Sequence, residues 1–367
     1  MTVEKTSRRK FLVSLGAASA AITVVGAGLG SVLATRTRTG KKTPALPSKS
    51  LPKSSQAASE ALPAGVLLAP AHGTRPEYTP LEDHYRIDIN LTPPVVDAET
   101  WALPITGLVK NPVRLTLNDL MTKYESMDQL ITLSCISNTI GGDLISTTRW
   151  TGVRVQKILD EVGVKGEARF LELESADGFD ETVPLELIRK EERIMFAYAW
   201  DGKPLEAKHG FPLRIYIPDR YGMKQPKWII KAKLVADFRP GYWVERGWDK
   251  EAHARATAVI DTVAVAEVVT ANNGERLVPV GGIAWAGARG ISGVELKVDD
   301  GEWTEARLRK PLSPTTWTIW RYDWPFRPGS HTFYVRCREG DGTPQIEASA
   351  GSFPSGATGL HHLKKKL

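Results

Sequence analysis

The segment LSCISNTIGGDLI, residues 133–145, decides how this chain is interpreted, because it places one of only two cysteines at a junction of local structure. A β-like run ends at Cys135, and the glycine pair Gly141–Gly142 follows it. Such a run is typical of a strand and the glycines of a turn. A lone cysteine there can be a structural thiol, a nucleophile or a metal ligand, and the segment alone leaves these alternatives open.

Length and composition favour a globular protein of two domains. The chain has 367 residues, of which 42% are hydrophobic and 25% charged, and a domain usually takes about 150 residues. The formal net charge of +6 owes much to basic termini. No zinc-finger spacing or aromatic RNA-binding pattern is present, so we expect no nucleic-acid partner.

The N-terminal residues 1–34 resemble an export signal. SRRKFL contains Arg8 and Arg9, and an uncharged, apolar stretch follows from Phe11 to Ala34. This pattern predicts a twin-arginine signal, and the stretch is also long enough to remain as a membrane anchor. Because the twin-arginine route exports folded proteins, it predicts a cofactor inserted before export and a location outside the cytoplasm. Residues 35–75 are expected to be a flexible linker.

The remaining chain is expected to be α+β, divided near residue 255. Residues 76–254 mix strand patterns with helices such as VRVQKILDEVG, which ends at Gly163, and predict a mixed α/β domain. Residues 255–358 contain short alternating runs between turns, which predicts an immunoglobulin-like β-sandwich. Residues 359–367 are expected to be a basic, solvated tail containing His361 and His362.

Cys337 lies in the second of these domains, in the alternating run HTFYVRCRE. Alternation predicts a half-buried structural thiol. A disulfide between Cys337 and Cys135 is not expected, since the two cysteines lie in different predicted domains and a disulfide needs a close approach of the two Cα atoms.

Three segments, in order, resemble the sulfite oxidase superfamily of molybdopterin enzymes. The family's cysteine segment is similar to residues 135–159, CISNTIGGDLISTTRWTGVRVQKIL. Its pterin-binding segment is similar to residues 209–229, HGFPLRIYIPDRYGMKQPKWI. The segment that follows in the family is similar to residues 241–248, GYWVERGW. The resemblance implies a molybdopterin-binding domain followed by a C-terminal dimerisation domain. It extends from about residue 78 to about residue 358.

The resemblance implies a role for Cys135 and for residues around it. In the family the cysteine thiolate is the protein ligand of molybdenum, which is also held by the pterin, and a soft thiolate suits that metal. The implied catalytic positions are Cys135, Arg86 and Trp248. The implied cofactor-binding positions, chosen because a pterin phosphate needs fixed positive charge and donors, are Tyr85, Arg86, Cys135, Asp177, His209, Arg214, Lys224 and Lys227. For Asp177, a plain hairpin turn is an equal alternative.

Two departures from the family pattern bear on the substrate. Trp248 occupies the position where family sulfite oxidases carry a tyrosine, and an indole cannot shuttle a proton as a phenol can. No basic residue follows Cys135 before Arg149. These departures leave the sulfite assignment open without affecting the cofactor assignment.

The function expected from these observations is an extracytoplasmic molybdenum oxidoreductase that transfers an oxygen atom between water and a small substrate resembling a sulfur oxyanion. A reductase of sulfoxides or N-oxides is the alternative, and a membrane-tethered binding protein is the alternative of another class. No haem-attachment motif is visible, so electrons must pass through a separate cytochrome or quinol-linked partner. A homodimer is expected from the tryptophans of the second domain: Trp285, Trp303, Trp317, Trp320 and Trp324.

Overall fold

The computed structural model describes residues 68–367, all within one compact unit. The predicted export signal, residues 1–34, and most of the predicted linker therefore lie outside the described residues. Within the described part of the chain, no helix has the length and apolarity needed to cross a membrane.

The first domain is built on two mainly antiparallel sheets. One has the order β2-β1-β10-β5-β6, and its only parallel pair is β1 with β10. Its strands are β1 (Ala102–Gly107), β2 (Val113–Thr116), β5 (Phe170–Ser175), β6 (Asp180–Pro184) and β10 (Ile229–Val235).

The second sheet of this domain carries the cysteine segment. Its order is β3-β4-β7-β8, and β9 also pairs with β7. The strands are β3 (Ser126–Ser134), β4 (Ile145–Arg154), β7 (Met195–Trp200), β8 (Lys203–Pro204) and β9 (Arg214–Tyr216). Cys135 follows β3 directly, and the chain returns along β4 after ten residues, so the cysteine lies at the start of the connecting loop.

Short helices join these strands, and their ends follow from local sequence. Helix α2 (Leu117–Lys123) begins with a capping box in which the Thr116 side chain accepts from the Asp119 backbone N–H and the Asp119 side chain accepts from Thr116, an arrangement that satisfies two unpaired donors. Helix α3 (Val155–Val162) ends at Gly163, whose φ is +64°, as predicted. Helix α4 (Leu185–Lys190) completes the set, together with the 3-10 turns η1 (Leu81–Asp83), η2 (Ala207–His209) and η3 (Gly222–Lys224).

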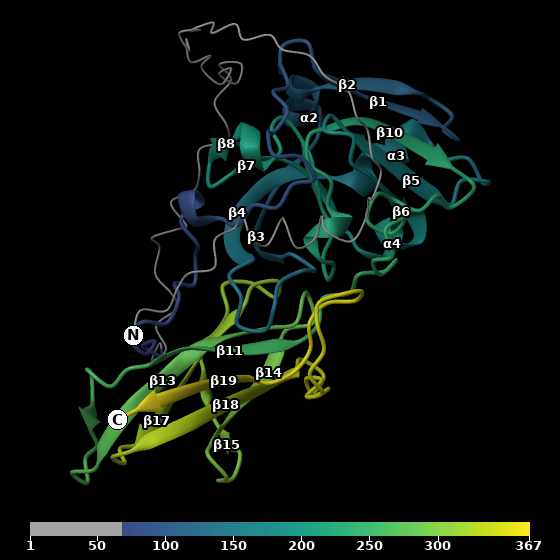
Figure 1. Ribbon diagram of the computed structural model, residues 1–367. Helices are drawn as coiled ribbons and strands as arrows, with labels where there is room; N and C mark the ends of the chain where they lie inside the picture. Colours follow the sequence, from purple (N-terminus) through teal and green to yellow (C-terminus); the bar gives the residue numbers. More distant parts are fainter. Residues whose placement is uncertain (1–67) are drawn as a thin grey trace, which may run out of the picture. The chain divides into compact units, whose positions relative to one another are not determined.

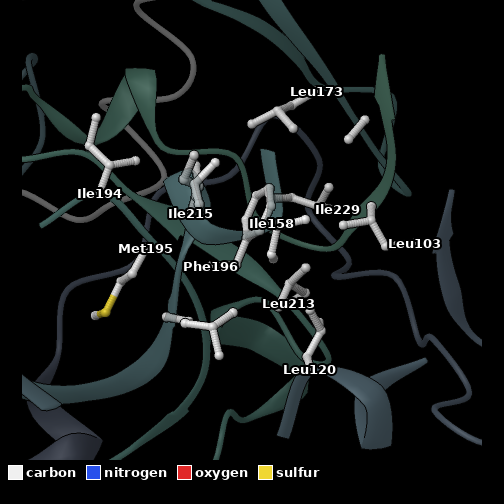
Figure 2. Packing of buried hydrophobic residues seen from close by; sticks show 14 of the residues in the cluster. Leu103, Leu120, Ile158, Leu173, Ile194, Met195, Phe196, Leu213, Ile215 and Ile229 are labelled. Carbon is white, nitrogen blue, oxygen red and sulfur yellow. The ribbon is translucent and has the colours of Figure 1, made fainter. Parts of the chain in front are cut away.

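The core of the first domain lies between helices and sheets (Figure 2). Leu103 of β1, Leu120 of α2 and Ile158 of α3 are fully buried beside Phe196 of β7 and Ile229 of β10. Residues far apart in the sequence thus share one apolar interior, and the strands that end near Cys135 are anchored in it. The domain is mostly β, with few and short helices, within the expected α+β class.

The second domain is the expected β-sandwich (Figure 1). One sheet contains β11 (Thr257–Val263), β13 (Arg276–Trp285), β17 (Thr318–Pro325) and β16 (Arg307–Leu308), with β12 (Val269–Thr270) paired to β13; the other contains β15 (Thr304–Glu305), β14 (Ile291–Val298), β18 (Ser330–Glu339) and β19 (His361–Lys366). Val280 and Trp320 from the first sheet pack with Val294 and Phe333 from the second in one buried cluster.

The expectation of a solvated C-terminal tail is wrong. Residues His361–Lys366 form strand β19, which pairs antiparallel with β18 along its whole length. His361 is partly buried, and its Nδ1 accepts a hydrogen bond of 3.0 Å from the Ile260 backbone N–H. Pairing satisfies the backbone groups of an otherwise open edge of β18, and this is why a basic, polar segment is ordered.

The tryptophans of the sandwich do not supply the dimer surface that was expected of them. Trp285, Trp317, Trp320 and Trp324 are all buried within the chain. Trp303 lies near the side chains of Lys297 and Arg336. The apolar area of the buried tryptophans is covered by other residues of the same chain. The homodimer therefore stays a prediction that these tryptophans do not support.

Cys337 is more deeply buried than the alternation suggested. Its side chain is 2% exposed, and its sulfur lies 3.2 Å from Gln345 Oε1. Both cysteines are free. A structural thiol in the sandwich core is consistent with these contacts.

The end of the predicted linker is packed against the sandwich. Arg75 donates to both carboxylate oxygens of Asp261 on β11, at 2.7 Å and 2.9 Å from Oδ1 and 3.1 Å from Oδ2. Arg309 pairs with Glu77 at 2.7 Å and donates to the Leu68 carbonyl. We call residues 68–79 the strap. Thr79 ends the strap on β4 of the first domain, where its backbone N–H donates to the Thr147 carbonyl at 2.8 Å.

Candidate cofactor site

Cys135 opens a loop that is closed by hydrogen bonds. Its backbone N–H donates to the Leu144 carbonyl at 3.0 Å, and the Asn138 side chain accepts from the Leu144 N–H at 3.0 Å. The sulfur lies 3.0 Å from Ser137 Oγ, and the residue is 8% exposed. Burial raises the pKa of this thiol, while bonds from Ser137 and the charge of Lys227 act against the rise. A cation bound at the sulfur would favour the thiolate further.

The glycine pair after the cysteine is required by close packing. Gly141 has φ +78°, and a Cβ there would lie 2.5 Å from the ring of His361 on β19. A Cβ at Gly142 would lie 2.3 Å from Asn138 Oδ1, the atom that closes the loop. Side chains at either position would displace the loop that carries Cys135.

His209 and Arg214 lie together in the predicted pterin segment. Turn η2 presents His209, and Arg214 at the start of β9 donates to the His209 carbonyl at 3.1 Å. The guanidinium carbon of Arg214 lies 4.7 Å from the ring centre of Trp150. Burial lowers the pKa of Arg214 to about 10 and that of His209 to about 2, so the arginine stays charged and the histidine neutral at neutral pH.

Lys227 provides a second buried cation. Its ammonium forms an ion pair with Asp88 and donates to the Ile87 carbonyl at 3.1 Å. Burial lowers the pKa of Lys227 to about 8, and Asp88 opposes that fall. The positive charge of Arg214 also lowers the pKa of Lys227, so two buried cations contribute to the electrostatics of this region.

Tyr85 and His84 reach the same region from the segment after η1. The Tyr85 backbone N–H donates to Ser146 Oγ at 3.0 Å, and its hydroxyl lies beside Gly222 of η3. Burial raises the pKa of Tyr85, and so does the charge of Cys135. His84 was not among the residues selected from the sequence, although it stands next to Tyr85. Its ring centre lies 5.3 Å from that of His209, and only tertiary packing reveals the proximity.

Arg86 and Lys224 are held by carboxylates. Arg86 is largely exposed, and its Nε donates to Asp88 at 2.5 Å. Lys224 is buried, and its ammonium pairs with Glu181 of β6 at 2.5 Å. Lys224 thus lies in the segment that resembles the pterin-binding motif, and Glu181 neutralises its charge. The role of Arg86 toward the substrate stays a prediction.

Asp177 and Trp248 lie on loops. Asp177 is in the hairpin turn between β5 and β6, where its side chain accepts from the Phe179 N–H at 3.0 Å and its carbonyl accepts from Asn90. Trp248 packs edge-on against Trp243 and Phe353, with ring centres 6.3 Å and 5.2 Å away. Asp177 therefore has the geometry of a hairpin-turn residue. A contact between Asp177 and the cofactor stays a prediction.

The donor set of this region fits a molybdopterin. Cys135 supplies a single thiol at a buried loop end. Arg214 and Lys227 supply cations, each with more N–H donors than it uses in hydrogen bonds to the described residues. A terminal phosphate requires such donors. Within residues 68–367, no group of three or more His, Cys, Asp or Glu side chains is placed to hold a metal ion by itself.

Comparison with known proteins identifies the family. The model for the oxidoreductase molybdopterin binding domain matches residues 90–243. The uncharacterized oxidoreductase YuiH of Bacillus subtilis (strain 168) is 32% identical over 154 residues, which are 41% of this chain and 74% of that protein. The chain belongs to the sulfite oxidase and nitrate reductase family of molybdopterin-binding oxidoreductases. It is therefore a molybdopterin-dependent enzyme, and the alternative of a non-enzymatic binding protein is set aside.

More distant family members share less of their length with this chain. An NAD(P)H nitrate reductase of Hordeum vulgare is 27% identical over 302 residues, 66% of this chain and 33% of that protein. Mitochondrial sulfite oxidase of Homo sapiens is 23% identical over 295 residues, 69% of this chain and 54% of that protein. The chain thus spans about a third to a half of the length of these relatives.

A solved structure supports the fold. The sulfane dehydrogenase SoxCD from Paracoccus pantotrophus matches with a TM-score of 0.62 and 21% sequence identity, over 74% of this chain and 77% of that chain. The expected succession of a molybdopterin-binding domain and a β-sandwich is confirmed.

Proposed function

We propose that this family member is an extracytoplasmic molybdenum enzyme that transfers an oxygen atom between water and a small sulfur-oxyanion-like substrate, with exchange of two electrons. The observation that carries the proposal is the single Cys135 thiol at a buried loop end, next to two buried cations. A lone protein ligand leaves other metal positions for chemistry. The twin-arginine pattern of residues 7–9 supports export of a folded, loaded protein.

Each residue would then have a limited task. The bound molybdenum cofactor supplies the oxygen-atom and two-electron chemistry. Cys135 would hold the metal, while Arg214 and Lys227 would bind anionic groups of the cofactor. Tyr85, whose pKa is raised by burial and by the charge of Cys135, stays protonated at neutral pH and can donate a hydrogen bond. Electrons would pass to or from a separate cytochrome or quinol-linked partner.

The charge pattern also favours a second candidate, a reductase of uncharged sulfoxides or N-oxides. Arg86, the residue predicted to meet an oxyanion, is paired with Asp88. An anionic substrate gains most from cations that lack such partners, whereas an uncharged oxide does not need them.

The test is a substrate panel on the purified, cofactor-loaded enzyme. Sulfite is supplied with an artificial electron acceptor, and sulfoxides and N-oxides with an artificial donor. Oxidation of sulfite alone supports the first function, and reduction of the oxides alone supports the second. If the enzyme contains about one molybdenum per chain and turns over neither class, both assignments are wrong.

A further inference from the structure

The outer face of one sandwich sheet carries a row of cations and rings. Strands β14, β18 and β19 lie side by side, and alternate residues of each pack into the core, so the residues between them face outward (Figure 1). Lys297, Tyr334 and His362 are direct neighbours on these strands, and the two rings are 5.6 Å apart. The Lys297 ammonium lies 5.1 Å from the ring centre of Tyr334 and 5.3 Å from that of Trp303. The row continues along β19, and we call the whole set the platform: Lys297, Trp303, Tyr334, His362, Lys364 and Lys366.

The positive charge of the platform is not compensated by ion pairs. Arg336 and Arg338, on the same face of β18, are paired with Glu295 and with two more glutamates. The lysines of the platform, by contrast, take part in no ion pair between residues 68 and 367. The acidic turn of residues 299–302 follows β14, two strands away from β19. Free positive charge is therefore concentrated along β19, where Lys364 and Lys366 are exposed.

Lysines interleaved with tryptophan and tyrosine are typical of a surface that meets lipid head groups. The ammonium groups can donate to lipid phosphates, and the rings suit the boundary between apolar and aqueous surroundings. A lysine near an anionic bilayer strengthens binding by about fivefold. Three such lysines give an enhancement of roughly 100-fold, which is too little for stable attachment from solution, so a second attachment to the membrane is required.

The N-terminal part of the chain offers that second attachment. It enters the structure at the sandwich, where the Leu68 carbonyl accepts from Arg309 next to β16. In the sequence, residues 35–67 separate Leu68 from the uncharged stretch of residues 11–34, which is expected to be long enough for a membrane anchor. A linker of that length has a root-mean-square extent of roughly 30 Å. A retained anchor thus keeps the sandwich at an effective concentration on the order of millimolar at the bilayer, where weak contacts suffice.

We propose that the platform docks on the anionic lipid head groups of the bilayer that holds residues 11–34. Lipid phosphates accept hydrogen bonds from Lys364 and Lys366, and Trp303 and Tyr334 lie at the level of the head groups. The sandwich is then the domain that faces the membrane. This inference concerns attachment to the membrane, and it depends on neither the substrate nor the cofactor.

Trace acetylation of lysines, quantified by mass spectrometry, tests the proposal on the full chain. The protein is incorporated into vesicles of phosphatidylcholine alone or of phosphatidylcholine mixed with phosphatidylglycerol. We expect Lys364 and Lys366 to react about fivefold more slowly on the mixed vesicles, and high salt to abolish this protection. Lys203 and Lys233 of the first domain are the internal controls, because both are exposed, and they should react equally on both kinds of vesicle.

A charge-removing variant provides an independent arm. Lys364→Gln combined with Lys366→Gln changes only exposed side chains, so the chain should fold, which circular dichroism checks, and Lys297 should lose its protection on the mixed vesicles. Lys203→Gln combined with Lys233→Gln is the matched control and should keep Lys297 protected. Equal reactivity of the platform lysines on both kinds of vesicle and in detergent would overturn the proposal. Protection that is the same on both kinds of vesicle would assign the face to a second copy of the chain instead, and a full chain that does not join the mixed vesicles would also contradict the docking.

Discussion

At the scale of single residues, the Cys135 sulfur is distinguished from the Cys337 sulfur by its surroundings. Cys135 opens a loop beside charged and aromatic side chains, whereas Cys337 lies between sheets and contacts Gln345. Burial raises the pKa of both thiols, that of Cys337 to about 12. Both thiols therefore stay protonated unless a neighbouring positive charge stabilises the thiolate. In the proposed function a bound metal ion provides that charge only at Cys135.

Replacing Cys135 by serine should lower turnover by more than about 100-fold, because loss of a direct metal ligand exceeds the loss of groups that only orient ligands. The chain should remain folded, since oxygen is nearly isosteric with sulfur. Turnover and molybdenum content are measured together. Cys337→Ser is the matched control: it should cost about 1 kcal/mol of stability and leave turnover intact. An active Cys135 variant with a full metal complement would disprove ligation by this sulfur.

Acid should destabilise the cofactor-free protein through His84 and His209. Burial lowers their pKa values to about 3 and about 2, while the unfolded chain binds protons near pH 6.5. Between about pH 6.5 and 3 the unfolded state therefore binds more protons, so stability falls as pH falls, by up to about 1.4 kcal/mol per pH unit for each histidine. Urea unfolding between pH 7 and pH 4 measures this slope. His84→Phe should reduce it by about one proton, and an unchanged slope would show that His84 is not buried and neutral.

At the scale of elements, the Lys224–Glu181 pair joins turn η3 of the pterin-like segment to strand β6. Both side chains are buried, and Glu181 Oε2 has no partner in the described part of the chain. Breaking a buried pair on one side leaves an uncompensated charge. The pair therefore holds the segment in place in addition to any contact of Lys224 with cofactor.

A double-mutant cycle separates these two roles. Lys224→Met and Glu181→Gln should each cost about 3 kcal/mol or more, and the double variant should cost less than their sum. Pterin retention is then measured on the double variant. Recovery of stability without recovery of pterin retention indicates that Lys224 also contacts the cofactor, and recovery of both indicates a purely structural pair. Additive stabilities would contradict the coupling itself.

The strap, residues 68–79, is a second element whose contacts hold the site segments in place. It connects the sandwich with strand β4, shortly before His84 and Tyr85 enter the site. Asp261→Asn removes the charge that holds Arg75 and should cost about 1–3 kcal/mol. It should also expose Arg75 to trypsin. Asp237→Asn, at an exposed position of the first domain, is the control and should change neither. Wild-type stability and trypsin resistance in the Asp261 variant would show that the strap contributes nothing.

At the scale of the whole molecule, the proposed location depends on the N-terminal signal. Replacing Arg8 and Arg9 by Lys should leave the protein in the cytoplasm, folded and with cofactor bound. A route that exports unfolded chains would be indifferent to this change. Cell fractionation with antibody detection is the measurement, and molybdenum analysis of the retained protein is the second readout. Unimpaired export of the double-Lys protein would count against the twin-arginine assignment and, with it, against the argument for loading before export.

The sequence by itself determined the local features and the family. The helix end at Gly163 follows from a few neighbouring residues and was predicted from them. The capping box at Thr116 depends equally on residues within one helical turn. The segments around Cys135 and His209 identify the family because their residues are close in sequence. The division into two kinds of domain follows equally from local periodicity.

Tertiary structure alone decided the rest. Strand β19 forms because it pairs with β18. The buried tryptophans of the sandwich pack between its sheets and against the first domain. Lys224 meets Glu181 from 43 residues away, and His84 meets Trp150 and Trp200 across different elements. Such pairings depend on which elements the core brings together, and no local pattern encodes a contact between side chains that are distant in the chain.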